Sequence, residues 1–219
     1  MPDILTKINK QIINCKKCPR LISYIDNIGK TKVRRFQNEK YWAKPIPSFG
    51  DPKAELLIIG LAPAAHGGNR TGRMFTGDSS GDWLAKVLYE NGFSTQPTST
   101  QRNDGFRLVN AYVTAAVHCA PPQNKPIKEE FENCSIYLEK ELELLPKIKV
   151  ILCLGKIAFD SCCKILEIKR KKFSHGNIFR HNNWTIICSY HPSRQNTQTG
   201  RLTWSQWNLV FKMAKKHLV

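Results

Sequence analysis

Four of the eight cysteines in this sequence have the spacing of metal ligands. Cys15 and Cys18 form a C-x-x-C pair, which lets two thiolates reach one metal site from a single turn of chain. Cys119 precedes a Pro-Pro pair, and Cys134 follows it in an acidic, helix-like run. Four thiolates from these segments can hold a zinc ion or a 4Fe-4S cluster, and their spacing alone does not separate the two.

The other four cysteines lie in apolar runs, where a free cysteine behaves as a small buried hydrophobe. We therefore predict core positions for Cys153, Cys162, Cys163 and Cys188. We expect a cytoplasmic protein, because the sequence shows no secretory signal and no apolar stretch near the roughly 20 residues of a membrane span. That compartment keeps thiols reduced, so a disulfide framework is not expected.

The second feature that could take part in chemistry is a glycine-rich segment, GLAPAAHGGNRTGRMFTGDSSG over residues 60–81. Such a segment lets backbone N–H groups approach a ligand closely, although it has neither the GK[ST] of a P-loop nor the glycine spacing of a dinucleotide fingerprint. Phe75 within it could stack on a base or pack in the core. Asp78 precedes the next expected helix, so it could be a helix N-terminal acid or a functional carboxylate.

A histidine and a run of hydrogen-bond donors follow the last expected strand. His191 comes directly after that strand and is followed by Pro192, so its ring should project at the strand's carboxyl end. The donors behind it are not interrupted by any acid, which suits phosphate binding. They are Ser193, Arg194, Gln195, Asn196 and Arg201.

The charge of the chain indicates a polyanionic partner. The sequence has 219 residues with 34 Lys plus Arg against 17 Asp plus Glu, a formal net charge of +17. Such an excess suits nucleic acid, a membrane surface or simple solubility. Residues 30–44 are a basic run that contains aromatic side chains, and it could be a solvated loop or a nucleic-acid contact. Hydrophobic residues at 41% exclude a disordered tail.

The elements that must position these groups alternate between helices and strands. Pro19 should stop or kink the chain after the first helix. The alternation predicts one α/β domain over residues 1–219, with a mainly parallel sheet between two helical layers. Residues after Gly60, near His118, after Leu154 and after Tyr190 should then face one cleft. We predict helices over 4–14, 81–91, 127–145, 156–166 and 202–217, and strands over 55–60, 106–118, 149–154 and 185–190.

Three separated motifs together resemble family 5 of the uracil-DNA glycosylase superfamily, the iron-sulfur branch also called type B. They are GLAPAAHGGNRTGR at 60–73, CAPPQNKP at 119–126, and HPS at 191–193 followed by QNTQTGRLT. The resemblance implies a three-layer α/β/α sandwich and the removal of uracil from DNA. It also implies a structural 4Fe-4S cluster on Cys15, Cys18, Cys119 and Cys134, which ties the N-terminal segment to the domain.

The resemblance also assigns roles around the base. The first motif, with Gly60, Ala62 and Ala64, would cradle it without the carboxylate that other families carry there, and Phe75 would stack on it. Ala115 stands where the sister family 4 has an Asn that reads the uracil edge. We therefore expect Asn124 to take that role, with Asn110 as a weaker candidate.

The remaining roles concern catalysis and the DNA strand. His191 would hydrogen-bond uracil O2 and stabilise the departing base, and Asp78 could orient water or steady the sugar cation. Gln195 would fill the gap left by the flipped base. The other expected DNA contacts are Arg70, Arg73, Ser193, Arg194 and Arg201.

The expected function is therefore a monofunctional DNA repair glycosylase. It would hydrolyse the N-glycosidic bond of uracil and leave an abasic site, with no diffusible cofactor and as a monomer in a bacterial or archaeal cytoplasm. A pocket that lacks the Asn at Ala115 could also admit hypoxanthine or xanthine. The alternative is a non-enzymatic DNA-binding protein that is stapled by zinc or an iron-sulfur cluster.

Overall fold

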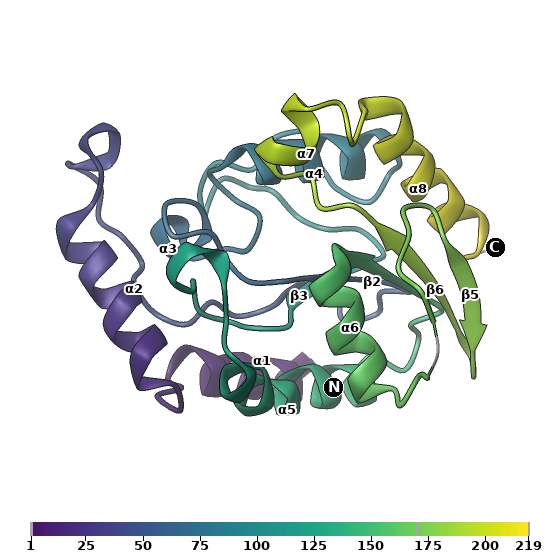
Figure 1. The fold of residues 1–219 in the computed structure, drawn as a ribbon, viewed down its shortest axis with the longest axis horizontal. Coiled ribbons are helices and arrows are strands. Elements are labelled where there is room, and N and C mark those ends of the chain that lie inside the picture. The colour runs from purple at the N-terminus through teal and green to yellow at the C-terminus, as the bar shows by residue number, and fades with distance from the viewer. Residues whose placement is uncertain (1, 170, 219) are drawn as a thin grey trace.

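A computed structural model describes residues 2–169 and 171–218, which build a six-stranded mixed sheet between two helical layers (Figure 1). The strand order is β1-β3-β2-β4-β6-β5. The central four strands run parallel, and an antiparallel strand closes each edge. The strands are β1 (Phe49–Gly50), β2 (Leu56–Gly60), β3 (Ala111–Ala115), β4 (Val150–Leu154), β5 (Ile178–His181) and β6 (Trp184–Ser189).

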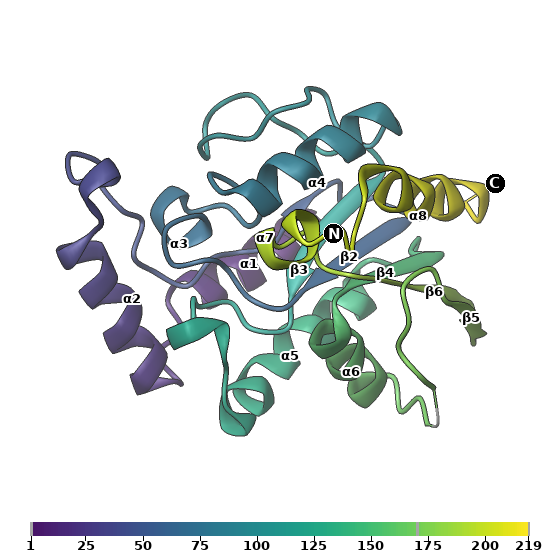
Figure 2. The same ribbon diagram turned by 45° about the horizontal axis from the view of Figure 1, so that its top comes forward.

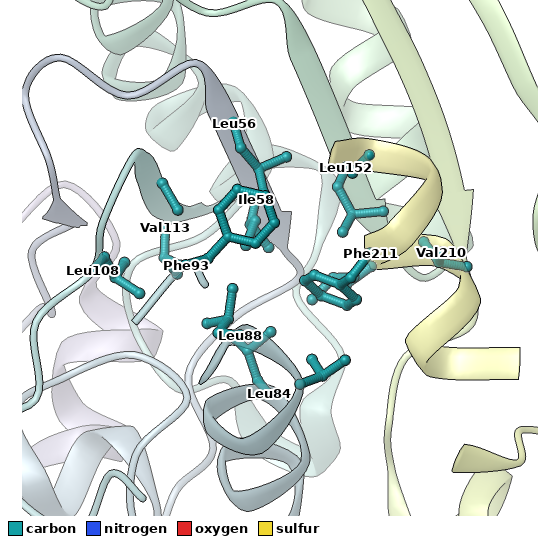
Figure 3. Close-up of a cluster of buried hydrophobic side chains, with 14 of the residues drawn as sticks. Leu56, Ile58, Leu84, Leu88, Phe93, Leu108, Val113, Leu152, Val210 and Phe211 are labelled. Carbon is teal, nitrogen blue, oxygen red and sulfur yellow. The ribbon is translucent and has the colours of Figure 1, made fainter. Parts of the chain in front are cut away.

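Every residue of β2, β3 and β4 is buried, as expected of parallel strands with both faces covered. On one face lie α4 (Ser79–Glu90) and α8 (Trp204–Lys216), where Leu88 and Phe211 pack against Ile58 and Leu152 (Figure 3). On the other face lie α1 (Pro2–Ile13), α5 (Lys128–Leu144) and α6 (Lys156–Ile165). The prediction of a three-layer α/β/α sandwich is therefore confirmed.

The helix α2 (Pro19–Thr31) corrects one expectation, because Pro19 begins a helix instead of ending one. Proline suits the first helical position, where its missing N–H has no partner to lose and its fixed φ is already helical. Leu21 and Ile25 of α2 pack beyond the sheet against Val117 and Ala120. The shorter elements are η1 (Arg34–Phe36), α3 (Gly68–Thr71), η2 (Pro122–Asn124) and α7 (Arg194–Gln198).

Two other boundaries differ from the sequence prediction. The expected strand 106–118 contains only β3 as regular strand. The last helix begins at Trp204 because the Thr203 hydroxyl accepts the Gln206 N–H and the Gln206 side chain accepts the Thr203 N–H in return. In the described part of the chain, no helix is both long and apolar enough to cross a membrane.

The cysteines of the sheet region lie where the sequence predicts. Cys153, Cys162 and Cys188 are each at most 1% exposed and belong to the core between the sheet and α6. Cys163 is half-buried and packs against the same core. These four residues are therefore part of the hydrophobic core, as expected.

Candidate functional site

A cleft of about 610 Å³ opens at the carboxyl ends of the parallel strands. Leu61 follows β2, Ala115 ends β3, Leu154 ends β4, and His191 follows β6, and all four line the cleft. The prediction that these strand ends share one cleft is thus confirmed. His118 is the exception, because it is fully buried behind β3 and its Nδ1 contacts the Ile46 carbonyl at 2.8 Å.

One side of the cleft, which we call the glycine-rich wall, consists of residues 61–80. Phe75 lies in it with a positive φ of 48°, and its ring rests against the bare Cα of Gly60. A Cβ at position 60 would come within 2.8 Å of the ring. Gly60 therefore supports the aromatic side chain, while Ala62 and Ala64 line the cleft directly.

Arg70 holds the glycine-rich wall together from outside the cleft. Its guanidinium donates to the carbonyls of His66 at 2.9 Å and Gly77 at 3.0 Å, and it pairs with Glu39. It also lies 3.8 Å from the centroid of the Phe36 ring. The Arg70 side chain, which we predicted to contact DNA, thus binds the glycine-rich wall and the segment after α2.

Arg73, which we predicted to contact DNA, lies inside the protein in this structure. The residue is 6% exposed, and its Nη2 donates to both oxygens of Asp104 at 2.8 and 2.7 Å. Further bonds reach Ser99, Thr76 and the Arg102 carbonyl. Burial alone would raise the pKa of Asp104, but Arg73 and three backbone N–H groups lower it to about 2. Arg73 therefore anchors the loop 99–104 from the interior.

Asp78 lies at the cleft and also begins α4. Its Oδ1 accepts the Gly81 N–H at 2.9 Å, which is the bond of a helix N-cap. A side chain at Gly67 would collide with the carboxylate, so the group is tightly enclosed. Burial raises the pKa of Asp78 above its ordinary value, against the stabilising effect of the backbone bonds. Asp78 thus caps α4 and is also among the residues that line the cleft.

The opposite side of the cleft, which we call the His191 wall, consists of residues 191–201. The His191 ring lies 5.8 Å from the Phe75 ring, with 31° between their planes. Enclosure by the protein lowers the pKa of His191 to about 4, so the imidazole is neutral near pH 7. Asn196 fixes the loop by donating to the His191 carbonyl at 2.8 Å.

Tyr190, immediately before His191, is fixed as well. Its N–H donates to Nδ1 of His175 at 3.1 Å, and the two rings stack with centroids 5.2 Å apart. The Arg201 guanidinium lies 4.5 Å from the Tyr190 ring centroid. Arg201 is not among the residues that line the cleft, so its observed contact is this ring.

The helix α7 presents the predicted strand contacts. It lies beside the beginning of α4 in both views (Figures 1 and 2), where Arg194 Nε is 3.3 Å from the Ser79 hydroxyl. Arg194 and Gln195 are exposed and line the cleft. Ser193 also lines it, and its hydroxyl accepts the Asn196 N–H at 3.4 Å as the N-cap of α7.

Of the two asparagines predicted to read the base, one lines the cleft and the other does not. Asn124 is exposed and lines the cleft from η2, as does Ala115 from β3. Asn110 lies before β3, at the amino end of the sheet, where its side chain bonds to Glu55 and accepts the Glu55 N–H. Asn110 therefore cannot reach the base cleft, and that weaker alternative is wrong.

Sequence reasoning missed several lining residues. Lys156 and Ile157 begin α6 and face the cleft, and Ser79 and Ser80 do so at the start of α4. The signal for the first pair was available, because both follow Leu154 at a strand end that should line the site. Ser79 and Ser80 were not predicted because Asp78, the acid immediately before them, was the stronger candidate in that segment.

The four candidate metal ligands come from three segments that converge beside α2. Cys18, Cys119 and Cys134 are buried in one apolar cluster with Leu21, and Cys15 packs on the adjoining cluster around Tyr137. Burial, with a smaller contribution from the nearby thiols of Cys18 and Cys15, raises the pKa of Cys134 to about 12, although a hydrogen bond from the His118 backbone lowers it. Among residues 2–169 and 171–218, no three metal-ligating side chains are arranged closely enough to hold an ion. Four converging thiols are nevertheless the donor set that suits an iron-sulfur cluster.

Comparisons with known proteins agree with this geometry. The sequence model of the uracil DNA glycosylase superfamily matches residues 47–213, a range that contains the whole cleft. A type-5 uracil-DNA glycosylase of Thermus thermophilus is 46% identical over 209 residues, which cover 92% of this chain and 93% of that protein. One from Pyrobaculum aerophilum is 45% identical over 193 residues, covering 88% and 84%. One from Mycobacterium leprae is 40% identical over 217 residues, covering 97% and 95%.

Proposed function

Because the chain belongs to the uracil-DNA glycosylase superfamily, and within it to the type-5 family, we propose that this DNA glycosylase removes uracil from DNA through His191 and Phe75. The observation that carries the proposal is the pairing of an aromatic ring and a neutral imidazole across one cleft, 5.8 Å apart. A flat base that enters the cleft finds a stacking surface and a hydrogen-bond donor there. The alternative of a DNA-binding protein without activity would leave this pair without a role.

The leaving base is the group that needs stabilisation. A base inside a duplex is out of reach, so the nucleotide is first flipped into the cleft at a cost of a few kcal/mol. As the N-glycosidic bond breaks, negative charge grows on the uracil carbonyl oxygens. The neutral imidazole of His191 donates a hydrogen bond to that charge, and one such donor is typically worth about 2.7–4 kcal/mol of barrier. The proton stays on the imidazole.

Water reaches the sugar from the side of Asp78. The first motif carries no carboxylate, and Asp78 is the acid that lines the cleft from the glycine-rich wall. Its Oδ1 is engaged by the Gly81 N–H, which fixes the direction in which the carboxylate faces. An ionised Asp78 would orient the water and offset the positive charge that develops on the sugar.

Asn124 reads the base from the third side of the cleft. Its amide offers one acceptor and two donors, the set that matches the edge of uracil. Ala115 leaves space where a second polar side chain would restrict the pocket. We therefore propose that hypoxanthine and xanthine are weaker substrates. The DNA strand itself contacts α7, with Ser193 and Arg194 on phosphates and Gln195 in the gap left by the base.

Cys15, Cys18, Cys119 and Cys134 would hold a 4Fe-4S cluster. The convergence of their side chains, three of which are buried and one half-buried, supports this assignment. When bound, the cluster supplies a structural cross-link between the start of α2, the loop after β3 and α5. Iron and acid-labile sulfide analysis with a visible absorption spectrum tests it, and a colourless protein that contains stoichiometric zinc would contradict it.

Uracil release from a defined duplex tests the proposed function. The protein is incubated with a uracil-containing duplex without added cofactor, and alkali then cleaves any abasic site. We expect strand cleavage at uracil and slower cleavage at hypoxanthine and xanthine. An intact strand on all three substrates would overturn the proposal.

Asp78→Asn tests the contribution of the Asp78 carboxylate separately from that of His191. Asparagine keeps an oxygen for the Gly81 N–H, so α4 keeps its cap while the charge is lost. We expect a slower single-turnover rate with unchanged stability. Glu139→Gln, exposed on α5 and outside both cavities, is the matched control for the loss of one negative charge.

A further inference from the structure

A second groove adjoins the base cleft and has no role in the steps above. It has a volume of about 920 Å³ and shares Asp78, Ser79 and Arg194 with the cleft. We call it the side groove. Its far side is formed by the segment after α2, with Arg35 and Lys40, and its floor by the loop 99–103.

The side groove carries available positive charge. Arg35, Lys40, Arg102 and Arg194 line it and are all exposed. Three acids also line it. Glu39 pairs with Arg70, which leaves Asp78, the N-cap of α4, and the exposed Asp82 against the four basic side chains. The groove thus attracts a ligand whose negative charges are spread along its length.

Aromatic rings hold two of these arginines in place. The Arg35 guanidinium lies 4.5 Å from the Phe36 ring centroid, and the Arg102 guanidinium lies 4.5 Å from the Trp42 centroid. Arg70 lies near Phe36 as well, at 3.8 Å. Stacked guanidinium groups lose less conformational entropy when they bind phosphate, and their planar forks suit phosphate oxygens. The basic run 30–44 therefore supplies a prepared surface and not only a solvated loop.

We propose that the side groove binds the sugar-phosphate backbone on one side of the nucleotide that occupies the cleft. The inference rests on the proposed function, because it takes a flipped nucleotide as its starting point. A strand with one nucleotide in the cleft must leave over the cleft's edge, and Ser79 and Arg194 are common to both cavities. The substrate site is therefore longer than the base pocket and extends in one direction along the strand.

The double variant Arg35→Ala/Arg102→Ala tests this with two single-stranded oligonucleotides. One has uracil near its 5′ end and a long 3′ flank, and the other has the reverse arrangement. Half-saturating enzyme concentration is measured in single-turnover experiments at several salt concentrations. We expect a rise of about tenfold for one oligonucleotide and less than about twofold for the other, since each phosphate contact is salt-dependent. For the affected substrate, the slope of log affinity against log salt should fall by about 1.4.

The matched control is Lys53→Ala/Lys147→Ala. These lysines are exposed at the amino end of the sheet. Replacing both removes the same total charge as the arginine variant does. Unchanged binding of both oligonucleotides by the arginine variant would overturn the inference. Equal weakening of both, or the same weakening by the lysine control, would assign the effect to overall charge and overturn it too. The rate of uracil release by the wild-type protein at saturating enzyme tests the proposed function separately. If that protein releases no uracil, the proposed function is disproved, whatever the side groove binds.

Discussion

The glycine-rich wall and the His191 wall face each other across one cleft, yet they use their polar side chains in opposite ways. In the glycine-rich wall, Arg70, Arg73 and Asp78 bond mainly to their own or a neighbouring loop. In the His191 wall, Arg194 and Gln195 are exposed and line the cleft, while the peptide around His191 is fixed. In the first wall the two arginines thus provide shape, while Phe75 and Asp78 line the cleft; in the second wall the polar side chains remain available to the substrate. Substitutions of the two arginines should therefore act on stability, and substitutions in the His191 wall on activity.

Arg73→Ala should have the largest effect and should act on stability. Its removal leaves the Asp104 carboxylate buried, 9% exposed, without its partner. Loss of one member of a buried ion pair typically costs about 3–5 kcal/mol, and urea unfolding measures the change. The pKa of Asp104 is about 2 in the folded protein, below its value in the unfolded chain. The stabilisation is therefore complete at pH values above the unfolded pKa and is lost as the pH falls toward 2.

Arg107→Ala is the control, because this arginine is exposed near the same loop. It should change the free energy of unfolding by less than about 0.5 kcal/mol. A stable Arg73→Ala variant with weakened DNA binding would reverse the division between the walls.

His191→Ala should leave stability nearly unchanged and slow the chemical step. Loss of one donor to a developing anion typically reduces the rate about 10²–10³-fold, measured as single-turnover uracil release at saturating enzyme. His181→Ala, on the hairpin strand β5, is the matched control and should retain the wild-type rate. A normal rate in His191→Ala would show that the loop alone stabilises the leaving base.

The pH profile follows from the same histidine. Its pKa is lowered to about 4 by burial, so protonation begins only as the pH falls well below the ordinary value for histidine. We expect no inflection attributable to His191 in the single-turnover rate between about pH 5.5 and 8. A step near pH 6.5 that disappears in His191→Ala would contradict the neutral, enclosed imidazole.

His175 should act through Tyr190 as a positioning residue. Its Nδ1 accepts the Tyr190 N–H, and asparagine can supply an oxygen at a similar place. We expect His175→Ala to lower the single-turnover rate about tenfold, with half-saturation unchanged, since it loosens the loop by about one hydrogen bond. His175→Asn should restore most of the rate. Equal loss in both variants would indicate that ring stacking, and not the hydrogen bond, fixes the loop.

The sequence was sufficient for the features that follow from regular periodicity and from the resemblance. The strand ends that share the cleft, the sandwich and the place of His191 and Phe75 were predicted. The burial of Arg73 was not, because it depends on Asp104, 31 residues away, and no local pattern pairs the two. The helix α2 was missed because Pro19 is compatible with either the end or the first turn of a helix. The side groove was missed because its sides come from distant segments.

Gln195→Ala should have the smallest effect and the most selective one. The side chain is exposed on α7 and lines the cleft, so it can enter the space that a flipped base leaves in a duplex. A single strand has no paired stack to restore, so the same side chain matters less there. We expect uracil release from duplex to fall about fivefold, equivalent to roughly 1 kcal/mol, and release from single strands to fall less than about twofold. Gln198→Ala, exposed on the same helix but not lining the cleft, should change neither rate. An equal loss on both substrates would mean that Gln195 contacts the strand backbone, which would place it with Arg194 and not in the gap.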